Sequence, residues 1–254
     1  MKPLNAWINN ISLQGLDGRI LIQGINDNAP QTEILYADNP GRPGQRLLTR
    51  RRVNRRISIT FAIRELRDLA ARAAIVDKVN GWAQDGVLQI SNRPEQQLRV
   101  VCAGRASITS PRDYTEEFKI DFDAAASPYW EDRTPQALTI TGSSGIGSLL
   151  NRGTADAMAT VTVTPTGGAL GALTISVGAC TFSFSGLSVA NNTPLRIDYD
   201  ERGILRVLAG NASRISCRTA ASDDDLIAAP GINAVSFLAD TACAVRVEVR
   251  GTWQ

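Results

Sequence analysis

Arginines are concentrated in one short segment of this chain. Five of the seven residues from 50 to 56 are arginine, and Arg42 and Arg46 lie just upstream. A guanidinium group binds phosphate and carboxylate oxygens through paired hydrogen bonds. The segment could therefore contact nucleic-acid phosphates, pair with carboxylates of the same chain or of a neighbouring subunit, or remain solvated. We predict interface charges, and the candidate residues are Arg50, Arg51, Arg52, Arg55 and Arg56.

Carboxylates gather in four places that could support catalysis or hold a cation. The clusters are Glu116, Glu117, Asp121 and Asp123; Glu131 and Asp132; Asp198, Asp200 and Glu201; and Asp223, Asp224 and Asp225. A glycosidase needs two carboxylates about 5–10 Å apart across a cleft, whereas soluble sheets commonly place such residues on outward strand positions and in turns. The triple aspartate lacks the alternation of a calcium loop. We predict that the protein is not an enzyme and has no catalytic residue, metal site or cofactor.

The residues needed for histidine-dependent catalysis, histidine-ligated zinc or a phosphate loop are missing from the sequence. The chain has no histidine, which excludes Ser-His-Asp and Cys-His catalysis and histidine-ligated zinc. The cysteines Cys102, Cys180, Cys217 and Cys243 lie far apart without a C-x-x-C pair, so we predict buried free thiols. Residues 142–147 are rich in glycine but lack the Lys-Ser/Thr of a phosphate loop. We predict a flexible connection or a wide hairpin there.

Composition is that of an ordinary globular protein. The 254 residues are 43% hydrophobic and 20% charged, with a net charge of +2. This excess is too small for the whole molecule to attract nucleic acid or a membrane. No apolar run is long enough for a spanning helix, and residues 1–7 contain no apolar signal segment. We expect a protein made in the cytosol, with no membrane partner.

The elements that must position these residues change in character near residue 133. Residues 19–24 predict a strand, and the prolines and glycines of 38–44 predict a loop or turn. Strict alternation up to residue 63 predicts a strand that buries Ile57, Ile59 and Phe61. Apolar residues at three- and four-residue steps predict a helix from Glu65 to about Asn80. Strands are predicted at 87–91, 98–106 and 114–122, completing an α+β domain, a β-sandwich or meander with one helix, over residues 1–133.

Short strands dominate the remainder, residues 134–254. They are rich in Thr, Val, Ile and Ser and are separated by turns that contain glycine. This pattern predicts an all-β sandwich of the galectin-like or jelly-roll kind. The predicted strands are 137–141, 159–164, 173–177, 181–185, 195–199, 205–208, 213–217, 234–238 and 244–249.

The order of motifs resembles that of phage distal tail proteins over nearly the whole chain. The motifs in the first half are the strand from Arg55 leading into Glu65-Leu66-Arg67-Asp68-Leu69, then Trp82 with Gly86, then Ser127-Pro128-Tyr129-Trp130. The motifs in the second half are Asn151-Arg152-Gly153-Thr154, Ile197-Asp198-Tyr199 and Pro230-Gly231-Ile232-Asn233. The sequence departs from the family at Ser127, where an aspartate is frequent, and in its long basic run. The ordered set carries the resemblance, since no single motif is highly specific.

The resemblance implies a structural virion protein, the distal tail or baseplate hub component. In that family the N-terminal domains form a hexameric ring beneath the tail tube, and the sandwich domains project outward. The implied partners are further copies of the chain, the tail tube protein, and the tail hub and tape-measure proteins, with DNA only as cargo passing through the ring. The implied location is the virion tail tip, after synthesis in the host cytoplasm. The arginines of 50–56 would then face a subunit interface or the lumen.

A carbohydrate-binding adhesion module of a phage or prophage tail is the alternative, with a host-surface glycan as its ligand. Sugar sites usually present aromatic faces, but Trp7, Trp82 and Trp130 lie outside the predicted sandwich and Trp253 is one residue from the chain end. A glycosidase built on paired carboxylates is a third hypothesis.

Overall fold

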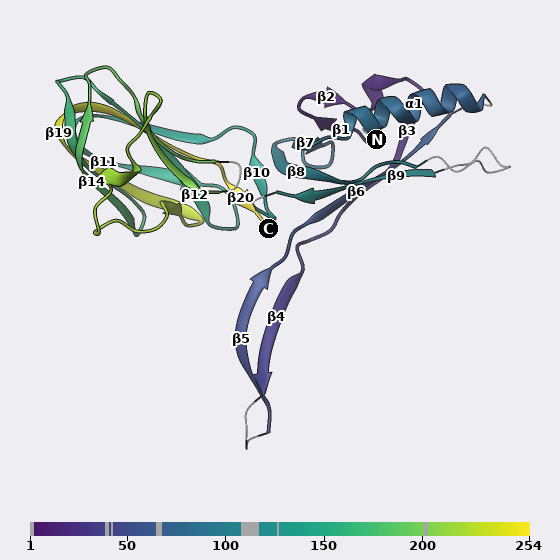
Figure 1. Cartoon of the computed structure of the whole chain (residues 1–254), viewed down its shortest axis with the longest axis horizontal. Coiled ribbons are helices and arrows are strands. Elements are labelled where there is room, and N and C mark those ends of the chain that lie inside the picture. Colours follow the sequence, from purple (N-terminus) through teal and green to yellow (C-terminus); the bar gives the residue numbers. More distant parts are fainter. Residues whose placement is uncertain are drawn as a thin grey trace. The chain divides into compact units, whose positions relative to one another are not determined.

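The chain forms two compact units, Met1–Trp130 with Gln254, and Glu131–Trp253. The structure, a computed structural model, describes residues 3–38, 41, 43–64, 68–107, 117–125, 127–200 and 203–254. Within these ranges the protein is mostly β, with two main antiparallel sheets and the single α-helix α1 (Leu69–Trp82) (Figure 1). This confirms the coarse fold prediction. The boundary at residue 133 and the galectin-like or jelly-roll assignment stay predictions.

The main sheet of the first unit runs in the order β2-β1-β7-β8-β9-β6-β3. Its strands are β1 (Ala6–Ile8), β2 (Ile11–Ser12), β3 (Ile20–Asp27), β6 (Arg56–Ile63), β7 (Gly86–Ile90), β8 (Gln96–Gly104) and β9 (Glu117–Ala124). The predicted alternation is confirmed, since Phe118, Ile120 and Phe122 of β9 are buried opposite Phe61, Ile59 and Ile57 of β6. The aromatic rings of Phe61 and Phe118 stack at 5.2 Å. These apolar pairs form the core on which the helix packs.

Helix α1 starts later than the sequence predicts and ends slightly beyond the predicted end. The predicted start, Glu65, lies outside the described residues, and Leu69, expected on the buried face, is 54% exposed. Asp68 caps the helix by accepting a hydrogen bond from the Ala70 amide at 2.9 Å, which satisfies a donor of the first turn. The buried face carries Val76, Val79 and Trp82, and Trp82 meets Phe122 edge to face. Among the described residues, no helix has the length and apolar composition needed to cross a bilayer.

A separate hairpin extends from the first unit. Its strands, β4 (Thr32–Asp38) and β5 (Gln45–Arg52), form a two-stranded sheet of their own (Figure 1). The turn predicted at 38–44 lies between these two strands, and neither strand is predicted from the sequence. Parts of that predicted turn, residues 39, 40 and 42, lie outside the described residues.

The second unit is one sheet that curls into a half-barrel. Its main path runs β14-β13-β19-β12-β15-β16-β17, and β11 pairs with β19. The 19-residue β19 joins the two halves, because its residues 235–239 pair with β13 and its residues 243–249 pair with β12. The larger strands are β11 (Gln136–Asn151), β12 (Ala157–Pro165), β13 (Leu170–Val177), β14 (Cys180–Val189), β15 (Leu195–Tyr199), β16 (Leu205–Ala209) and β19 (Gly231–Val249). The short strands of this sheet are β17 (Ala212–Ser213) and β18 (Ile227–Ala228), whereas β10 (Trp130–Asp132) and β20 (Thr252–Trp253) pair with each other outside it.

Three predictions for the second unit are wrong. Residues 142–147 are part of β11, with a bulge between Gly142 and Ser144, and are not a flexible connection or a hairpin. The glycines are needed there because a Cβ on Gly145 would meet the side chain of Ile140, and one on Gly147 would lie 2.7 Å from Leu138. Residues 234–238 and 244–249 are two parts of one strand rather than two strands. Residues 213–217 contain the end of β17 and a 3-10 turn at Ile215–Cys217 instead of a strand.

The motifs of the second half have structural roles. Asn151 is buried and donates hydrogen bonds to the carbonyls of Ala155 and Ala228 at 3.0 and 2.9 Å. Asn233, also buried, donates to the carbonyls of Ala229 and Gly231 at 2.7 and 3.1 Å. Such side-chain amides satisfy backbone groups where strands begin and end.

The four cysteines are free thiols. Cys243 is buried, but Cys102, Cys180 and Cys217 are partly exposed, so the predicted burial is wrong for these three. Burial raises the pKa of the Cys243 thiol above its ordinary value, because desolvation penalises the thiolate.

Candidate functional site

The hairpin, which we call the arm (Thr32–Asp38 and Gln45–Arg52), exposes an unusual amount of apolar surface. Every residue of β5 is exposed, as are all residues of β4 except Ala37. The large apolar side chains are between 43% and 55% exposed and are Ile34, Leu35, Tyr36, Leu47 and Leu48. An isolated two-stranded hairpin is at best marginally stable in water. The arm therefore has the features of a segment that is covered by another polypeptide.

Both faces of the arm carry arginine as well as apolar groups. Directly opposed residues share a face, so Ile34 lies beside Arg50 on one face, and Glu33 lies beside Arg51 on the other. Arg51 pairs with Glu33 at 2.6 Å across the strands, but both side chains are more than half exposed. Such an exposed pair contributes little to stability, and both groups remain accessible to a partner.

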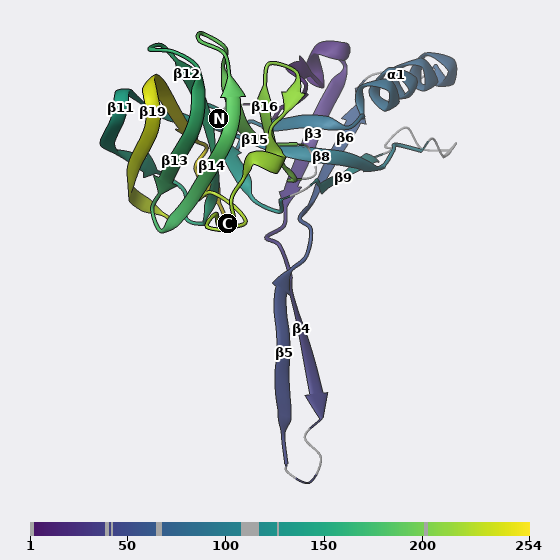
Figure 2. The same cartoon turned by 60° about the vertical axis from the view of Figure 1, so that its left-hand side comes forward.

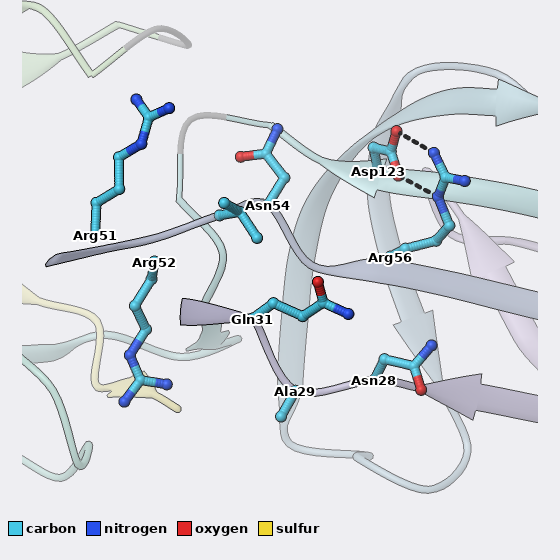
Figure 3. Close-up of a pocket in the computed structure, with 9 residues that line it drawn as sticks. Asn28, Ala29, Gln31, Arg51, Arg52, Asn54, Arg56 and Asp123 are labelled. Carbon is cyan, nitrogen blue, oxygen red and sulfur yellow. Dashed lines mark hydrogen bonds and ion pairs between the residues drawn. The ribbon is translucent and has the colours of Figure 1, made fainter. Parts of the chain in front are cut away.

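The structure does not bring the five predicted arginines together. Arg50, Arg51 and Arg52 lie on β5, Arg55 lies between β5 and β6, and Arg56 begins β6. Figure 3 shows that the side chains of Arg51 and Arg52 leave the strand on opposite sides. The basic run is therefore split into exposed arm charges and two arginines that are held by carboxylates at the root of the arm.

An open cavity of about 920 Å³ lies at the root of the arm. Its lining combines amide side chains with three arginines and one carboxylate: Asn28, Ala29, Gln31, Arg51, Arg52, Val53, Asn54, Arg56 and Asp123. Arg56 donates two hydrogen bonds to Asp123, at 2.7 and 3.0 Å (Figure 3). This pairing raises the pKa of Arg56 and lowers the pKa of Asp123 from its ordinary value. The guanidinium groups do not converge on one point, so the cavity is a polar junction and not a built anion site.

Arg55 has a different role, because it is buried beneath the root of the arm. Its side chain is 1% exposed and its Nη1 donates to Asp27 Oδ1 at 3.0 Å. Asp27 also accepts from Arg93 Nε at 2.7 Å and from Trp130 Nε1 at 3.1 Å, and the Arg93 guanidinium lies 5.3 Å from the centre of the Trp130 ring. Burial lowers the pKa of Arg55, and Asp27 opposes that shift. Arg55 is thus part of a buried ion pair in this chain, and its interface role stays a prediction.

We call these four residues, Asp27, Arg55, Arg93 and Trp130, the Asp27 cluster. It joins the end of β3, the start of β6, the turn between β7 and β8, and the last residue of the first unit. One carboxylate therefore connects the arm ends of β3 and β6 to the turn between β7 and β8 of the same sheet. Sequence reasoning missed the cluster because its members lie up to 103 residues apart.

Carboxylates of three of the four clusters have local partners. Asp198 pairs with Arg206 at 2.9 Å, and Asp223 accepts from the Thr181 amide at 2.6 Å. Asp121 accepts from the Ser58 hydroxyl at 2.5 Å. Within the described part of the chain, no three Cys, Asp or Glu residues are grouped so that they could hold a metal ion. Glu116 and Glu201 lie outside the described residues.

Comparison with known proteins finds similarity in fold but no match in sequence. No protein-family model matches this sequence, and no curated protein matches it. The structural comparison gives a similarity over 98% of this chain and 99% of the other, with a TM-score of 0.70 and 12% identity, to the Dit (gp 19.1) protein of phage SPP1. The fold resembles that of the SPP1 Dit protein. That protein is described as a paradigm of the hub adsorption apparatus in phages that infect Gram-positive hosts.

Two further solved structures with a similar fold are chains of a phage baseplate. Chains of the phage p2 baseplate in its activated conformation match with TM-scores of 0.52 and 0.51, at 8% and 9% identity, over 98% of this chain. The matched regions span 97% and 98% of the two baseplate chains. The similarity includes both units of the fold, so the resemblance inferred from the ordered motifs is confirmed at the level of structure.

Proposed function

We propose that this protein is a structural component of a phage tail, the distal tail or baseplate hub protein. The observation that carries the proposal is the similarity to the Dit fold over 98% of the chain. A match that included one unit alone would suggest a shared module, because common sandwich folds occur in proteins of many functions. A match through both units supports the same architecture and a related task. In this role the protein is not an enzyme and needs no cofactor.

The proposed working form is a ring of six copies that joins the tail tube to the tail tip. In a closed ring each protomer contributes two different surfaces, one to each neighbour. The arm supplies one of them, because it exposes apolar side chains and arginines on both faces. Among the described residues its two strands pair only with each other. The neighbouring copy would cover Leu35, Leu47 and Leu48 and supply carboxylates to Arg50 and Arg52.

The proposed partners are the tail tube protein on one side of the ring and the tail hub and tape-measure proteins on the other. DNA would pass through the ring as cargo without sequence recognition. The location would be the virion tail tip, after synthesis in the host cytoplasm.

The mass of the purified protein in solution tests the ring. Light scattering on a sizing column should give six times the protomer mass of 27.3 kDa, or twice that mass where two rings associate. A monomer at every concentration, together with saturable binding on a glycan array, would instead support the carbohydrate-binding alternative. That alternative lacks the usual aromatic platform, because Trp82 and Trp130 are at most 4% exposed and Trp7 and Trp253 are half-buried.

A further inference from the structure

Strand β11 is a long edge strand without a single charge. Its 16 residues, Gln136–Asn151, include neither a charged residue nor a proline. It pairs with β19 along its length and, among the described residues, with no other strand; Figure 2 shows it at the margin of the sheet beside β19. Exposed edges are normally protected by charges, prolines or bulges, because their free backbone groups accept a further strand. Beyond the bulge at Gly142, residues 144–151 have no such protection.

The sheet face beside this edge is also free of charge. On β11 its residues are Ser144, Ile146, Ser148 and Leu150, and on β19 they are Ile232, Ala234, Ser236 and Leu238. Thr174 and Ser176 of β13 continue it, opposite Leu238 and Ser236. Ile146, Ile232 and Leu238 are 83%, 80% and 64% exposed. We call these ten residues the charge-free face.

The other half of the same unit differs. Its outer strand positions carry the ion pairs Arg206–Asp198, at 2.9 Å, and Arg246–Glu248, at 2.7 Å. The charge-free face thus lies in one half of the curled sheet and ends at the exposed Asp240 of β19, which accepts hydrogen bonds from the Gly171 and Ala172 amides. A surface of this kind, with adjacent exposed aliphatic side chains, is typical of a site covered by another polypeptide.

We propose that the free edge of β11 pairs with β11 of a second copy of this chain, antiparallel and around a two-fold axis. A two-fold interface needs only one surface, provided that this surface is complementary to itself. Residues 144–151 meet this condition, because no two like charges can oppose one another in any register. Pairing centred on Gly147 places Ile146 opposite Ser148 and Ser144 opposite Leu150, and the two charge-free faces become continuous.

Charge also argues for this occupant over a charged strand from elsewhere. A lysine or aspartate placed against residues 144–151 would lose hydration and find no counter-charge on the edge or on the charge-free face. A second copy of β11 brings its own backbone donors and acceptors and no charge. This interface uses a different strand from the arm, so it does not depend on the proposed ring.

The test combines two sets of variants of the full chain. Leu35→Lys with Leu48→Lys places charges on the arm and is designed to prevent the ring. Ile146→Lys places a charge on the β11 edge, at a side chain that is 83% exposed. The matched control is Ile204→Lys, the same substitution at a 57% exposed residue in the turn between β15 and β16. Circular dichroism establishes that each variant is folded.

Sedimentation equilibrium over a wide concentration range then gives the mass of each variant. The arm variant should form dimers of twice 27.3 kDa. Adding Ile146→Lys should abolish the dimer and leave a monomer, whereas adding Ile204→Lys should leave the dimer unchanged. A folded arm variant that stays monomeric at every concentration would overturn the proposal, as would a dimer that survives Ile146→Lys. If the ring does not exist, the wild-type chain should itself be a dimer, so failure of the ring and failure of this interface give different masses.

Discussion

Several single polar residues in this chain stabilise the fold through hydrogen bonds. Asp27 accepts hydrogen bonds from three side chains, and Asn151 and Asn233 satisfy backbone groups at strand ends. The sequence marks the two asparagines through their motifs, because both contact carbonyls within four residues, although Asn151 also donates to the remote carbonyl of Ala228. It gives no such sign for Asp27, whose partners Arg55, Arg93 and Trp130 are remote in sequence.

Replacing Asp27 should be strongly destabilising. Asp27→Asn removes the negative charge that compensates the buried Arg55, and breaking one partner of a buried ion pair costs about 3–5 kcal/mol. Urea unfolding followed by tryptophan fluorescence should show this loss, and Trp130, which donates to Asp27, should report it directly.

The control for that experiment is Glu33→Gln. Glu33 pairs with Arg51 at 2.6 Å, and the two side chains are 52% and 72% exposed. Exposed pairs contribute little to stability, so the free energy of unfolding should change only slightly. Equal losses in the two variants would contradict the structural role of the Asp27 cluster.

The phenol of Tyr199 should lose its proton at a higher pH than an ordinary tyrosine. Burial, the largest cause, raises the pKa of its phenol to about 12, and the hydroxyl accepts a hydrogen bond from the Leu226 amide at 2.8 Å. Its pKa in the unfolded chain is about 10. The neutral phenol therefore contributes stability that is fully present below about pH 10 and is lost as the pH rises toward 12.

An ultraviolet titration of tyrosinate measures this shift. The wild-type protein should show a late step that is absent from Tyr199→Phe, and its free energy of unfolding should fall over the same alkaline range. A late step that persists in Tyr199→Phe would assign the shift to another tyrosine.

At the scale of elements, the sequence predicts the strands and the helix that have one buried face, and it does not predict strands that lack one. The alternation of β6 and β9 and the buried Val76 and Val79 of α1 are read correctly, because each element has one buried face. Strand β5 is exposed on both faces, so its sequence shows no alternation to detect. The glycines of β11 resemble a loop, although they are required by close packing against Ile140 and Leu138.

Adding a methyl group to β11 tests that explanation. Gly145→Ala should destabilise the second unit by about 1–3 kcal/mol, the usual cost of overpacking, because its Cβ would meet Ile140 and lie 3.1 Å from Phe237. Gly24→Ala in β3 is the matched control, since no heavy atom lies within 4 Å of the added Cβ. Comparable urea midpoints for the two variants would show that the glycine in β11 is not required for packing.

Charges on the arm should prevent formation of the ring without preventing folding. Leu35 and Leu48 are 55% and 54% exposed, so Leu35→Lys with Leu48→Lys should leave the circular dichroism spectrum and the thermal midpoint nearly unchanged. Because the same substitutions would bury two charges in an arm interface, the six-copy species should be lost. A sizing column with light scattering checks this, and a six-copy species that persists would remove the arm from the ring interface.

At the scale of the whole molecule, the order of weak motifs predicts more than any one residue. Sequence identity to the SPP1 Dit protein is only 12%, yet the similarity in fold spans 98% of the chain. A fold constrains its buried apolar positions and its turns, whereas surface residues are free to differ. The basic run illustrates the limit, because its position in sequence does not reveal that Arg55 is buried and Arg51 is exposed.

We propose that this chain works as a six-membered ring at a phage tail tip. The most direct measurement is negative-stain electron microscopy of the largest species from a sizing column, sorted into class averages. We expect ring-shaped particles with six-fold symmetry and an open centre, lost in Leu35→Lys with Leu48→Lys. Class averages of closed rings with another symmetry would contradict the six-copy arrangement, and compact particles without a central opening would contradict the ring itself.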